Sequence, residues 1–346
     1  MPANDPQWLA RQLLPWFDRH GRFDLPWQRP RSRYRVWVSE IMLQQTQVQT
    51  VIGYFQRFVE ALPSLPDLAA ASQDEVLALW SGLGYYSRAR NLHAAAQVCM
   101  QQHNAQLPGD QAALMALPGI GRSTAAAILA QADGLPLAIL DGNVKRVLAR
   151  FHAVQGWPGR SAVSQQLWQL AEAHTPLQRC ADYTQAIMDL GATICRRQKP
   201  DCPNCPLAAR CMARQQQRQL ELPERKPRKQ RPLRQRIVLL SRIDDHWLLQ
   251  RRPPSGLWGG LFSPLIGEDR DNLLDTLAAY QPQQPERRSE LDFEHAFSHF
   301  QLQAEVWQVR LNAANAVADD QLRLMSTQQA LASGLPAPIR RLFNAL

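Results

Sequence analysis

The chain lacks any apolar run that approaches the roughly 18 residues needed to cross a membrane. Its N-terminus also lacks the charged and then apolar pattern of a secretory signal. These two absences predict a soluble protein that stays in the cytoplasm. Acidic residues are in short supply, since 30 Asp and Glu stand against 39 Lys and Arg, for a net charge of +9. This excess favours a polyanionic partner, and a merely solvated basic surface is the common alternative.

Cysteine is also scarce, with six in 346 residues and no secretion signal, which argues against a disulfide scaffold. Four of the six lie close together in the spacing C-x6-C-x2-C-x5-C: Cys195, Cys202, Cys205 and Cys211. In a reducing compartment, four thiolates so close in sequence predict a metal site. Zinc and a [4Fe–4S] cluster both accept four cysteine ligands, so the spacing alone leaves these two alternatives open.

The length predicts about two domains, and a hydrophobic content of 45% suffices for their cores. Residues 215–235 are polar, basic and interrupted by prolines, which is typical of an interdomain linker. Apolar residues before the linker follow helical spacing, whereas short strand-like runs begin at residue 236. We therefore expect a mainly helical domain over residues 1–214 and a smaller α+β domain over residues 236–346. In the second domain we expect strands at 236–241, 247–251, 297–303 and 303–311, and a helix near 271–280.

A glycine-containing stretch between two predicted helices organises the first domain. Helices are expected over residues 110–116 and 123–130, the second because of its alanines. The hairpin between them has Gly119 and Gly121 at alternate positions, and without Cβ atoms they allow a sharp bend and close approach of a partner. The amides that lead to Ser123 would then point outward at a helix N-terminus, which is an anion site suited to a DNA phosphate. An ordinary helix–turn–helix connection is the alternative.

Two carboxylates are candidates for catalysis. Asp141 follows an apolar run and precedes a helix expected to start near Asn143, so it is predicted to be the N-cap and to lie near the hairpin. Glu40 has mostly apolar helical neighbours three and four residues away, which predicts that it points into a pocket. Burial raises the pKa of a carboxyl, and a glutamate that stays protonated near neutral pH can act as a general acid. A structural glutamate with a buried partner is the alternative for Glu40.

Two further segments carry side chains suited to DNA. Gln44 and Gln45 follow on the same predicted helix, and amides can hydrogen-bond to base edges or simply form a solvated face. Tyr85 and Tyr86 follow a glycine turn and precede two arginines. An aromatic ring beside cations suits base stacking with phosphate contact, although a tyrosine in a core is common.

The hairpin with its downstream aspartate resembles the helix-hairpin-helix DNA glycosylases, the superfamily that includes endonuclease III, with the motif at about residues 110–132. The segment from Ser39 to Val48 resembles the adenine DNA glycosylases of the MutY type, and the resemblance extends from about Trp8 to the last helix. It implies that Glu40 protonates adenine and that Asp141 stabilises the sugar cation. It also implies that Gln45, more than Gln44, wedges into the opposite strand, and that one of the two tyrosines intercalates beside the lesion.

The cysteine spacing resembles the iron–sulfur loop of endonuclease III and MutY proteins, over residues 195–211, which implies a [4Fe–4S] cluster. In superfamily members that also cut the DNA strand, a lysine in the second hairpin helix forms a Schiff base with the sugar. Here the corresponding residue is Ser123, so the resemblance implies a monofunctional glycosylase that leaves an abasic site. Asn143 and Lys145, which follow Asp141, are expected to contact DNA.

The second domain looks like a Nudix-type fold from residue 251 to residue 264. Nudix hydrolases need a dense Arg-Glu-x-x-Glu-Glu helix, and the acids available here lack that arrangement: Glu268, Asp269, Asp271 and Asp275. The domain instead resembles the lesion-recognition domain of MutY proteins, in which a Phe-Ser-His loop senses 8-oxoguanine. The matching residues are Phe297, Ser298 and His299.

The sequence therefore predicts a monomeric adenine DNA glycosylase that acts on double-stranded DNA containing A:8-oxoguanine or A:G mispairs, with no membrane partner. Two alternatives stay open. One is a bifunctional pyrimidine-lesion glycosylase and lyase, against which Ser123 argues. The other is a catalytically inert iron–sulfur protein that binds DNA.

Overall fold

The structure is a computed structural model that describes residues 5–227, 231–253, 256–297, 299–312 and 321–346. Residue contacts divide the chain into two compact units. The first unit comprises Met1–Ala70 and Asn91–Arg228, and the second comprises Ala71–Arg90 and Lys229–Leu346. Residues 71–90 thus group with the C-terminal residues, although the sequence pattern had assigned them to the helical domain. None of the described helices is long and apolar enough to span a membrane.

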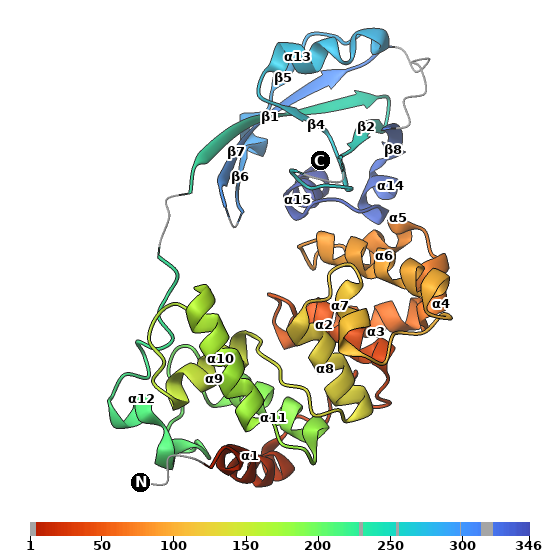
Figure 1. The fold of residues 1–346 in the computed structure, drawn as a ribbon. Coiled ribbons are helices and arrows are strands. Elements are labelled where there is room, and N and C mark those ends of the chain that lie inside the picture. The colour runs from red at the N-terminus through yellow and green to blue at the C-terminus, as the bar shows by residue number, and fades with distance from the viewer. Residues whose placement is uncertain (1–4, 228–230, 254–255, 298, 313–320) are drawn as a thin grey trace. The chain divides into compact units, whose positions relative to one another are not determined.

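The first unit is helical (Figure 1). Its helices are α1 (Gln7–His20), α2 (Arg33–Leu43), α3 (Val48–Ala61), α4 (Leu65–Ala70), most of α6 (Ser87–Gln102), α7 (Gln111–Ala116), α8 (Arg122–Asp133), α9 (Gly142–Phe151), α10 (Ser161–His174), α11 (Cys180–Thr193) and α12 (Met212–Gln215), with the 3-10 turn η1 (Ala208–Arg210). The helices predicted around the glycine hairpin correspond to α7 and α8, which confirms that part of the sequence analysis.

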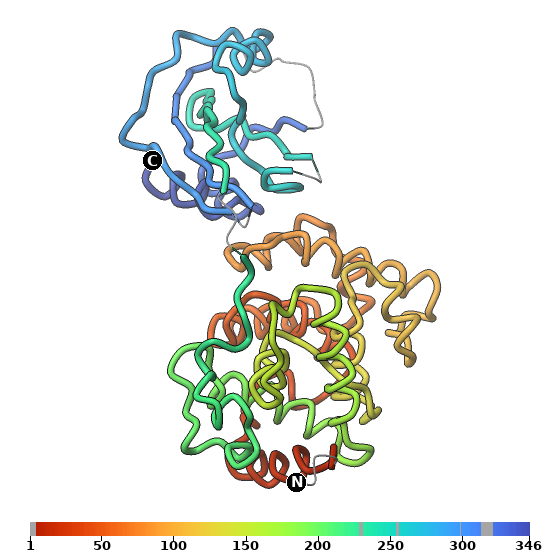
Figure 2. The backbone as a smooth tube through the Cα atoms, turned by 60° about the vertical axis from the view of Figure 1, so that its left-hand side comes forward, coloured from red at the N-terminus to blue at the C-terminus, as the bar shows by residue number. Residues whose placement is uncertain are grey.

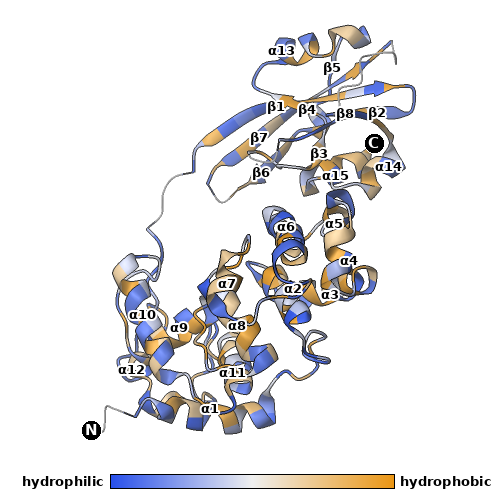
Figure 3. Cartoon of the chain, turned by 45° about the vertical axis from the view of Figure 1, so that its right-hand side comes forward, coloured by the Kyte–Doolittle hydropathy of each residue, from blue (hydrophilic) through white to orange (hydrophobic). Residues whose placement is uncertain are grey.

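Helix α8 lies in the middle of this unit and packs against both α2 and α11. Its residues from Ala125 to Ala130 are buried, and Figure 3 shows the hydrophobic colour of this helix. Small alanine side chains let the neighbouring helices come close. An adjoining hydrophobic core is formed by α1, α9, α10 and α11, and its buried side chains include Phe17, Leu148 and Leu190. The red α1 runs beside the green cysteine segment in Figure 2, and the Arg210 guanidinium lies 4.5 Å from the Trp8 ring centroid.

The second unit contains a mixed sheet. Its strands are β1 (Leu233–Ile243), β2 (His246–Arg251), β3 (Phe262–Ser263), β4 (Leu265–Gly267), β5 (Glu286–Arg287), β6 (Phe293–Ala296), β7 (Gln301–Arg310) and β8 (Leu322–Ser326). The long strands β1 and β7 pair in parallel, and β2 pairs with β1 in antiparallel orientation. Helix α13 (Arg270–Asp275) lies on one side of the sheet in Figure 1, and α15 (Ala337–Ala345) lies on the other. The remaining elements are α5 (Gln73–Leu79), α14 (Thr327–Ala332), η2 (Ala278–Tyr280) and η3 (Ser289–Leu291).

One strand prediction for this unit was wrong. The sequence suggested strands over 297–303 and 303–311, whereas the structure has a single strand, β7, preceded by β6 at Phe293–Ala296. Between them the chain turns, and the Phe297 amide donates to the Phe300 carbonyl at 2.9 Å. The alternating burial of β7 continues through residue 303, so nothing there breaks the strand. The predicted strand pair at 236–241 and 247–251 is confirmed, with β1 beginning earlier, at Leu233.

Candidate active site

A pocket in the first unit is lined by both carboxylates that the sequence singled out. Its volume is about 440 Å³, within the range of sites for small molecules. Six predicted site residues line it together: Glu40, Gln44, Gln45, Ser123, Asp141 and Asn143. Four lining residues that the sequence analysis missed are Arg22, Trp27, Gln185 and Met188. The pocket therefore gathers residues from α2, α8, α9 and α11 and from the segment between α1 and α2.

Glu40 lies in the last turn of α2, and its neighbours on that helix anchor it. Val36 and Trp37 are fully buried, which fixes the face of α2 that Glu40 adjoins. The side-chain amide of Gln131 on α8 donates a hydrogen bond to Glu40 Oε1 at 3.2 Å. Burial of the carboxyl, followed by the nearby negative charge of Asp141, raises the pKa of Glu40 to about 7, while the Gln131 hydrogen bond opposes this rise. Glu40 can therefore hold a proton near neutral pH.

Asp141 is the N-cap of α9, as predicted. Its Oδ1 accepts the Val144 amide hydrogen at 2.7 Å, and its Oδ2 accepts a longer hydrogen bond of 3.4 Å from the Asn143 side chain. Burial raises the pKa of Asp141, and the hydrogen bonds from Val144 and Asn143 together with the positive charge of Arg146 oppose that rise. The cap thus fixes a carboxylate rigidly in the pocket and supplies donors to its charged form.

The glycine hairpin adjoins this pocket. Gly119 has a φ of +77°, and a Cβ there would lie 2.8 Å from Cβ of Asn91, so only glycine fits. Gly121 is the N-cap of α8, and because it has no side chain the first amides of the helix receive no side-chain cap. Ser123 in the first turn accepts the Leu140 amide hydrogen through Oγ at 2.9 Å. This bond ties the hairpin to the segment that leads into Asp141.

The two glutamines that line the pocket differ in conformation. Gln44 is half-buried at the end of α2, whereas Gln45 is exposed and has a φ of +59°. A left-handed backbone at a residue other than glycine is sparsely populated and strained. Here it accompanies an exposed amide side chain beside the pocket.

The structure separates the two tyrosines that the sequence could not distinguish, and both lie in the second unit. Tyr85 is 51% exposed with a φ of +49°. The Tyr86 hydroxyl accepts the Gly82 amide hydrogen and donates to the Leu335 carbonyl, both at 3.2 Å. Tyr86 is therefore a structural residue, and Tyr85 is the one available to a ligand.

The predicted lesion loop lies at the turn between β6 and β7. Phe297 stacks on Phe300 with ring centroids 4.5 Å apart, and the exposed His299 lies 4.7 Å from Phe300. Ser298 falls outside the described residues. The acids of this unit were expected to lack the arrangement of a Nudix metal helix; of these, Glu268 pairs with Arg236 at 2.7 Å and Asp269 caps α13.

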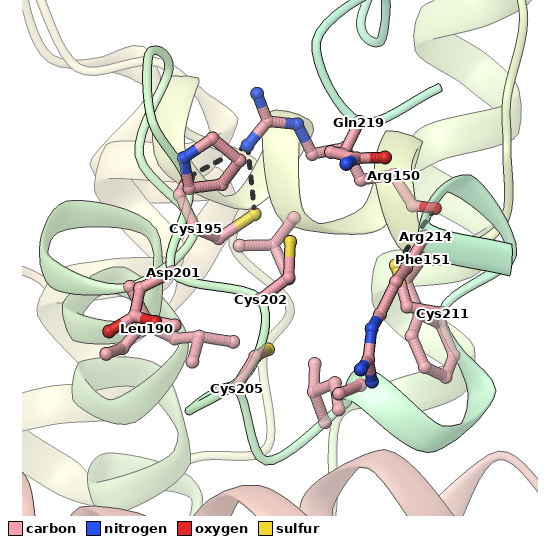
Figure 4. Close-up of a pocket in the computed structure, with 15 residues that line it drawn as sticks. Arg150, Phe151, Leu190, Cys195, Asp201, Cys202, Cys205, Cys211, Arg214 and Gln219 are labelled. Carbon is pink, nitrogen blue, oxygen red and sulfur yellow. Dashed lines mark hydrogen bonds between the residues drawn. The ribbon is translucent and has the colours of Figure 1, made fainter. Parts of the chain in front are cut away.

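The four predicted cysteine ligands line one cavity of the first unit (Figure 4). Apolar side chains surround them, among them Phe151, Leu190 and Leu207. The buried guanidinium of Arg150 donates to Cys195 Sγ at 3.4 Å, and also to the carbonyls of Arg196 and Arg197 at 2.7 and 3.1 Å. A donor aimed at the sulfur suits a negatively charged thiolate.

Four cysteines that line one cavity are a donor set that both a zinc ion and a [4Fe–4S] cluster accept. The Arg150 donor at Cys195 suits either group, because both are bound by negatively charged thiolates.

Arg146 connects the cysteine loop to the pocket. Its guanidinium donates to the Cys195 carbonyl at 2.7 Å, to the Gly191 carbonyl at 2.6 Å and to Asn143 Oδ1 at 2.8 Å. Asn143 in turn donates to Asp141. Lys145 lies on the same helix, one turn after Asp141. One short helix, α9, therefore carries the capped carboxylate and the arginines that hold the cysteine loop.

The comparisons with known proteins agree with this fold and site. Residues 38–173 match the model of the HhH-GPD superfamily of base excision DNA repair proteins, and residues 236–345 match that of the NUDIX domain. A thermostable thymine-DNA glycosylase superposes with a TM-score of 0.54 at 27% identity, covering 61% of this chain and 97% of that one. Endonuclease III in a non-covalent DNA complex shares the fold, with a TM-score of 0.53 at 22% identity, covering 62% of this chain and 98% of that one. The hairpin, the paired carboxylates and these matches define a helix-hairpin-helix glycosylase of base excision repair.

Sequence relatives narrow the class. The chain is 35% identical over 303 residues to the adenine DNA glycosylase of Buchnera aphidicola subsp. Acyrthosiphon pisum (strain APS), and the alignment covers 88% of this chain and 87% of the relative. It is 46% identical over 219 residues to the adenine DNA glycosylase of Homo sapiens, covering 61% of this chain and 40% of that protein. The chain belongs to the adenine DNA glycosylase family, and it is a hydrolase of DNA base excision repair.

Proposed function

We propose that this enzyme removes adenine mispaired with 8-oxoguanine or guanine in double-stranded DNA, by hydrolysis that leaves an abasic site. The observation that carries the proposal is the shared pocket of Glu40 and Asp141, in which burial raises the pKa of Glu40 to about 7. Cleavage of a glycosidic bond asks for one carboxyl that donates a proton and a second that bears negative charge. The cap donors around Asp141 favour its charged form.

The target adenine must leave the duplex to reach this pocket, at an unstacking cost of roughly a few kcal/mol. Gln185 suits recognition of the base. Its amide nitrogen donates to Asp189 at 2.7 Å, and within the described part of the chain its oxygen has no hydrogen-bond partner, so it is available to the amino group of adenine. Arg22 is held at the same wall by an ion pair of 2.7 Å with the fully buried Asp189.

The proposed reaction begins with proton transfer from Glu40 to N7 of adenine. The protonated base is a better leaving group, so the bond from the sugar to the base lengthens and its electron pair goes to the base. The sugar develops oxocarbenium character, which the Asp141 carboxylate stabilises by its negative charge or by brief covalent capture. A water molecule then adds at the anomeric carbon and loses a proton, which leaves the abasic site.

Ser123 supports the monofunctional outcome. Strand cleavage by this superfamily requires an amine that forms a Schiff base with the opened sugar, and a hydroxyl cannot do so. In this structure the hydroxyl of Ser123 is also occupied as the acceptor for the Leu140 amide. Its role here is to position the segment before Asp141.

We assign the remaining contacts to DNA by the chemistry of the groups. The uncapped amides after Gly121 would bind a backbone phosphate, with Asn143 and Lys145 beside them. Gln45 would wedge into the opposite strand. Tyr85 would stack beside the lesion, and Phe297 and His299 would contact 8-oxoguanine; the exposure of Tyr85 and of His299 supports this assignment.

A [4Fe–4S] cluster would be held by Cys195, Cys202, Cys205 and Cys211. When bound it would supply a rigid cross-link of the loop and, in principle, electron transfer. Arg150 would donate to the Cys195 ligand and hold the loop carbonyls, and Arg146 would connect the loop to the cap of Asp141. The exposed side chains of Arg196, Arg197 and Lys199 would be presented to DNA phosphates by this loop.

The Glu40→Gln variant tests the proposal. Adenine release from an A:8-oxoguanine duplex is expected to fall by roughly 10²- to 10⁴-fold under single-turnover conditions, because the amide cannot donate the catalytic proton. Binding of the same duplex should survive. The control is Glu60→Gln on the exposed end of α3, which should leave the rate unchanged. Unimpaired turnover of Glu40→Gln, or a wild-type enzyme that ignores A:8-oxoguanine, would contradict the proposal.

A further inference from the structure

Residues 71–90 are fastened to the C-terminal part of the chain by several contacts within the second unit. Asp74 of α5 forms an ion pair with Arg251, and Ser81 Oγ accepts a hydrogen bond of 2.7 Å from Arg340. Gly334 packs closely against α5: if residue 334 carried a Cβ atom, that atom would lie 3.4 Å from Cβ of Leu77. This segment is therefore an integral part of the unit that carries the sheet.

The loop that presents Tyr85 is held in an unusual shape. Gly82, Gly84 and Tyr85 all have positive φ angles, of +95°, +75° and +49°. The guanidinium of the buried Arg88 donates to the Gly84 carbonyl at 3.1 Å and lies 5.5 Å from the Tyr85 ring centroid. Tyr86 anchors the loop to Leu335. The Tyr85 side chain is thus presented by a fixed backbone.

One further contact connects this loop with the aromatic side chains of Trp258 and Phe297. Arg90 follows the tyrosines on α6, and its Nη1 donates to the Gly259 carbonyl at 2.5 Å. The preceding Trp258 has a left-handed backbone with a φ of +53°, and its ring centroid lies 6.2 Å from that of Phe297. Burial lowers the pKa of Arg90, as expected of a guanidinium enclosed by its partners. Arg90 and the Trp258–Gly259 turn therefore join the tyrosine loop to the β6–β7 turn.

We infer that Tyr85 forms a single preassembled recognition element with Phe297 and His299, and that Arg90 is the positioning residue that couples them through the Trp258–Gly259 turn. The inference rests on the proposed function, because it concerns how the oxidised guanine opposite adenine is recognised. Groups that are already positioned in the free protein lose less conformational entropy on binding. Coupling of Tyr85 to Phe297 should therefore strengthen the discrimination between 8-oxoguanine and guanine opposite adenine. Arg90 itself need not touch the DNA.

The test compares single-turnover adenine release from A:8-oxoguanine and A:G duplexes. In Arg90→Met the ratio of the two rates is expected to fall by roughly tenfold, as for loss of one charge-assisted hydrogen bond, while the A:G rate stays unchanged. Arg90→Lys should restore much of the ratio, because an ammonium can still donate to the Gly259 carbonyl. The control is Arg310→Met at the far end of β7, an exposed residue of the same unit.

A double-mutant cycle makes the test sharper. If the two elements act as one, the effects of Arg90→Met and Phe297→Ala on the ratio should be strongly non-additive. An unchanged ratio in Arg90→Met, equal losses on both duplexes, or additive effects would each overturn the inference while leaving the proposed function intact. Equal wild-type rates on the two duplexes would also overturn the inference, whereas a wild-type enzyme that released adenine from neither duplex would count against the proposed function. Thermal unfolding of each variant confirms that the comparison is made on folded protein.

Discussion

Gln131 Nε2 donates a hydrogen bond of 3.2 Å to Glu40 Oε1, and Gln131 is a buried residue with 4% of its surface exposed. A donor of this kind favours the ionised carboxylate, so it lowers the pKa of Glu40. Burial and the charge of Asp141 act in the opposite direction and prevail. The three influences together place the titration of Glu40 in the physiological range.

The pH dependence of adenine release should reflect this balance. The general acid is protonated below a pH of about 7 and is lost above it, so the single-turnover rate should decline as the pH rises through 7. Gln131→Met removes the donor that favours the anion, which raises the pKa of Glu40 and should move this limb to higher pH. Gln49→Met, on the exposed face of α3, is the control. If the rate of Gln131→Met declined over the same pH range as that of the wild type, the Gln131 amide would not be what lowers the pKa of Glu40.

The raised pKa of Glu40 also makes the free energy of unfolding depend on pH. The usual pKa of glutamate is 4.5, so below that pH both folded and unfolded chains hold the proton and Glu40 contributes no pH dependence. As the pH rises from 4.5 to about 7, only the unfolded chain releases it, and the free energy of unfolding should fall by about 3 kcal/mol. Urea unfolding at several pH values measures this loss. In Glu40→Gln the loss should disappear, and an identical pH profile would show that Glu40 is not the group responsible.

The two hairpin glycines give a matched pair of substitutions. Gly119→Ala should destabilise the protein by about 1–3 kcal/mol, because φ is +77° and the new Cβ would clash with Asn91. Gly121→Ala should cost less, about 0.5–1 kcal/mol for the poorer N-cap, since φ is −92° and no heavy atom of the described residues lies within 4 Å of the new Cβ. DNA binding should nevertheless weaken in Gly121→Ala, because the methyl group occupies the approach of a phosphate. Equal binding by Gly121→Ala and the wild type would argue against the anion site.

Ser123→Lys should introduce an amine into the catalytic pocket. We expect some cleavage of the DNA strand after adenine release, and trapping of a covalent complex by borohydride, because the amine can form a Schiff base with the sugar. The substitution also removes the acceptor for the Leu140 amide, so a loss of about 1 kcal/mol in stability is expected alongside. Ser123→Ala is the control for that loss. If Ser123→Lys released adenine but neither nicked nor trapped DNA, residue 123 would not be what determines the reaction outcome.

Local sequence patterns were sufficient for those parts of the site that depend on one helix. The cap role of Asp141 followed from its place before a helix, and the burial of Glu40 followed from the apolar residues one turn away. Arg22, Gln185 and Met188 could not be found in this way. They belong to segments far apart in the sequence, and only tertiary packing brings them to one wall of the pocket.

The tyrosines show a second limit of sequence reasoning. Two identical adjacent residues give the same local signal, and they differ only in backbone conformation and in a partner some 250 residues away along the chain, Leu335. The grouping of residues 71–90 with the second unit was hidden for the same reason. The apolar face of α5, which includes Val76 and Leu77, predicts that it packs on something, without indicating which part of the chain covers it.

That grouping also limits how the protein can have been assembled and how it can be rebuilt. The polypeptide passes from one unit to the other after Ala70, after Arg90 and after Arg228. The second unit is therefore not a separate domain joined to the first by a single linker. Grafting a foreign module in place of residues 229–346 would strip α5 of its covering and expose Leu77. A working chimaera would need the guest module and residues 71–90 to be exchanged as a matched set.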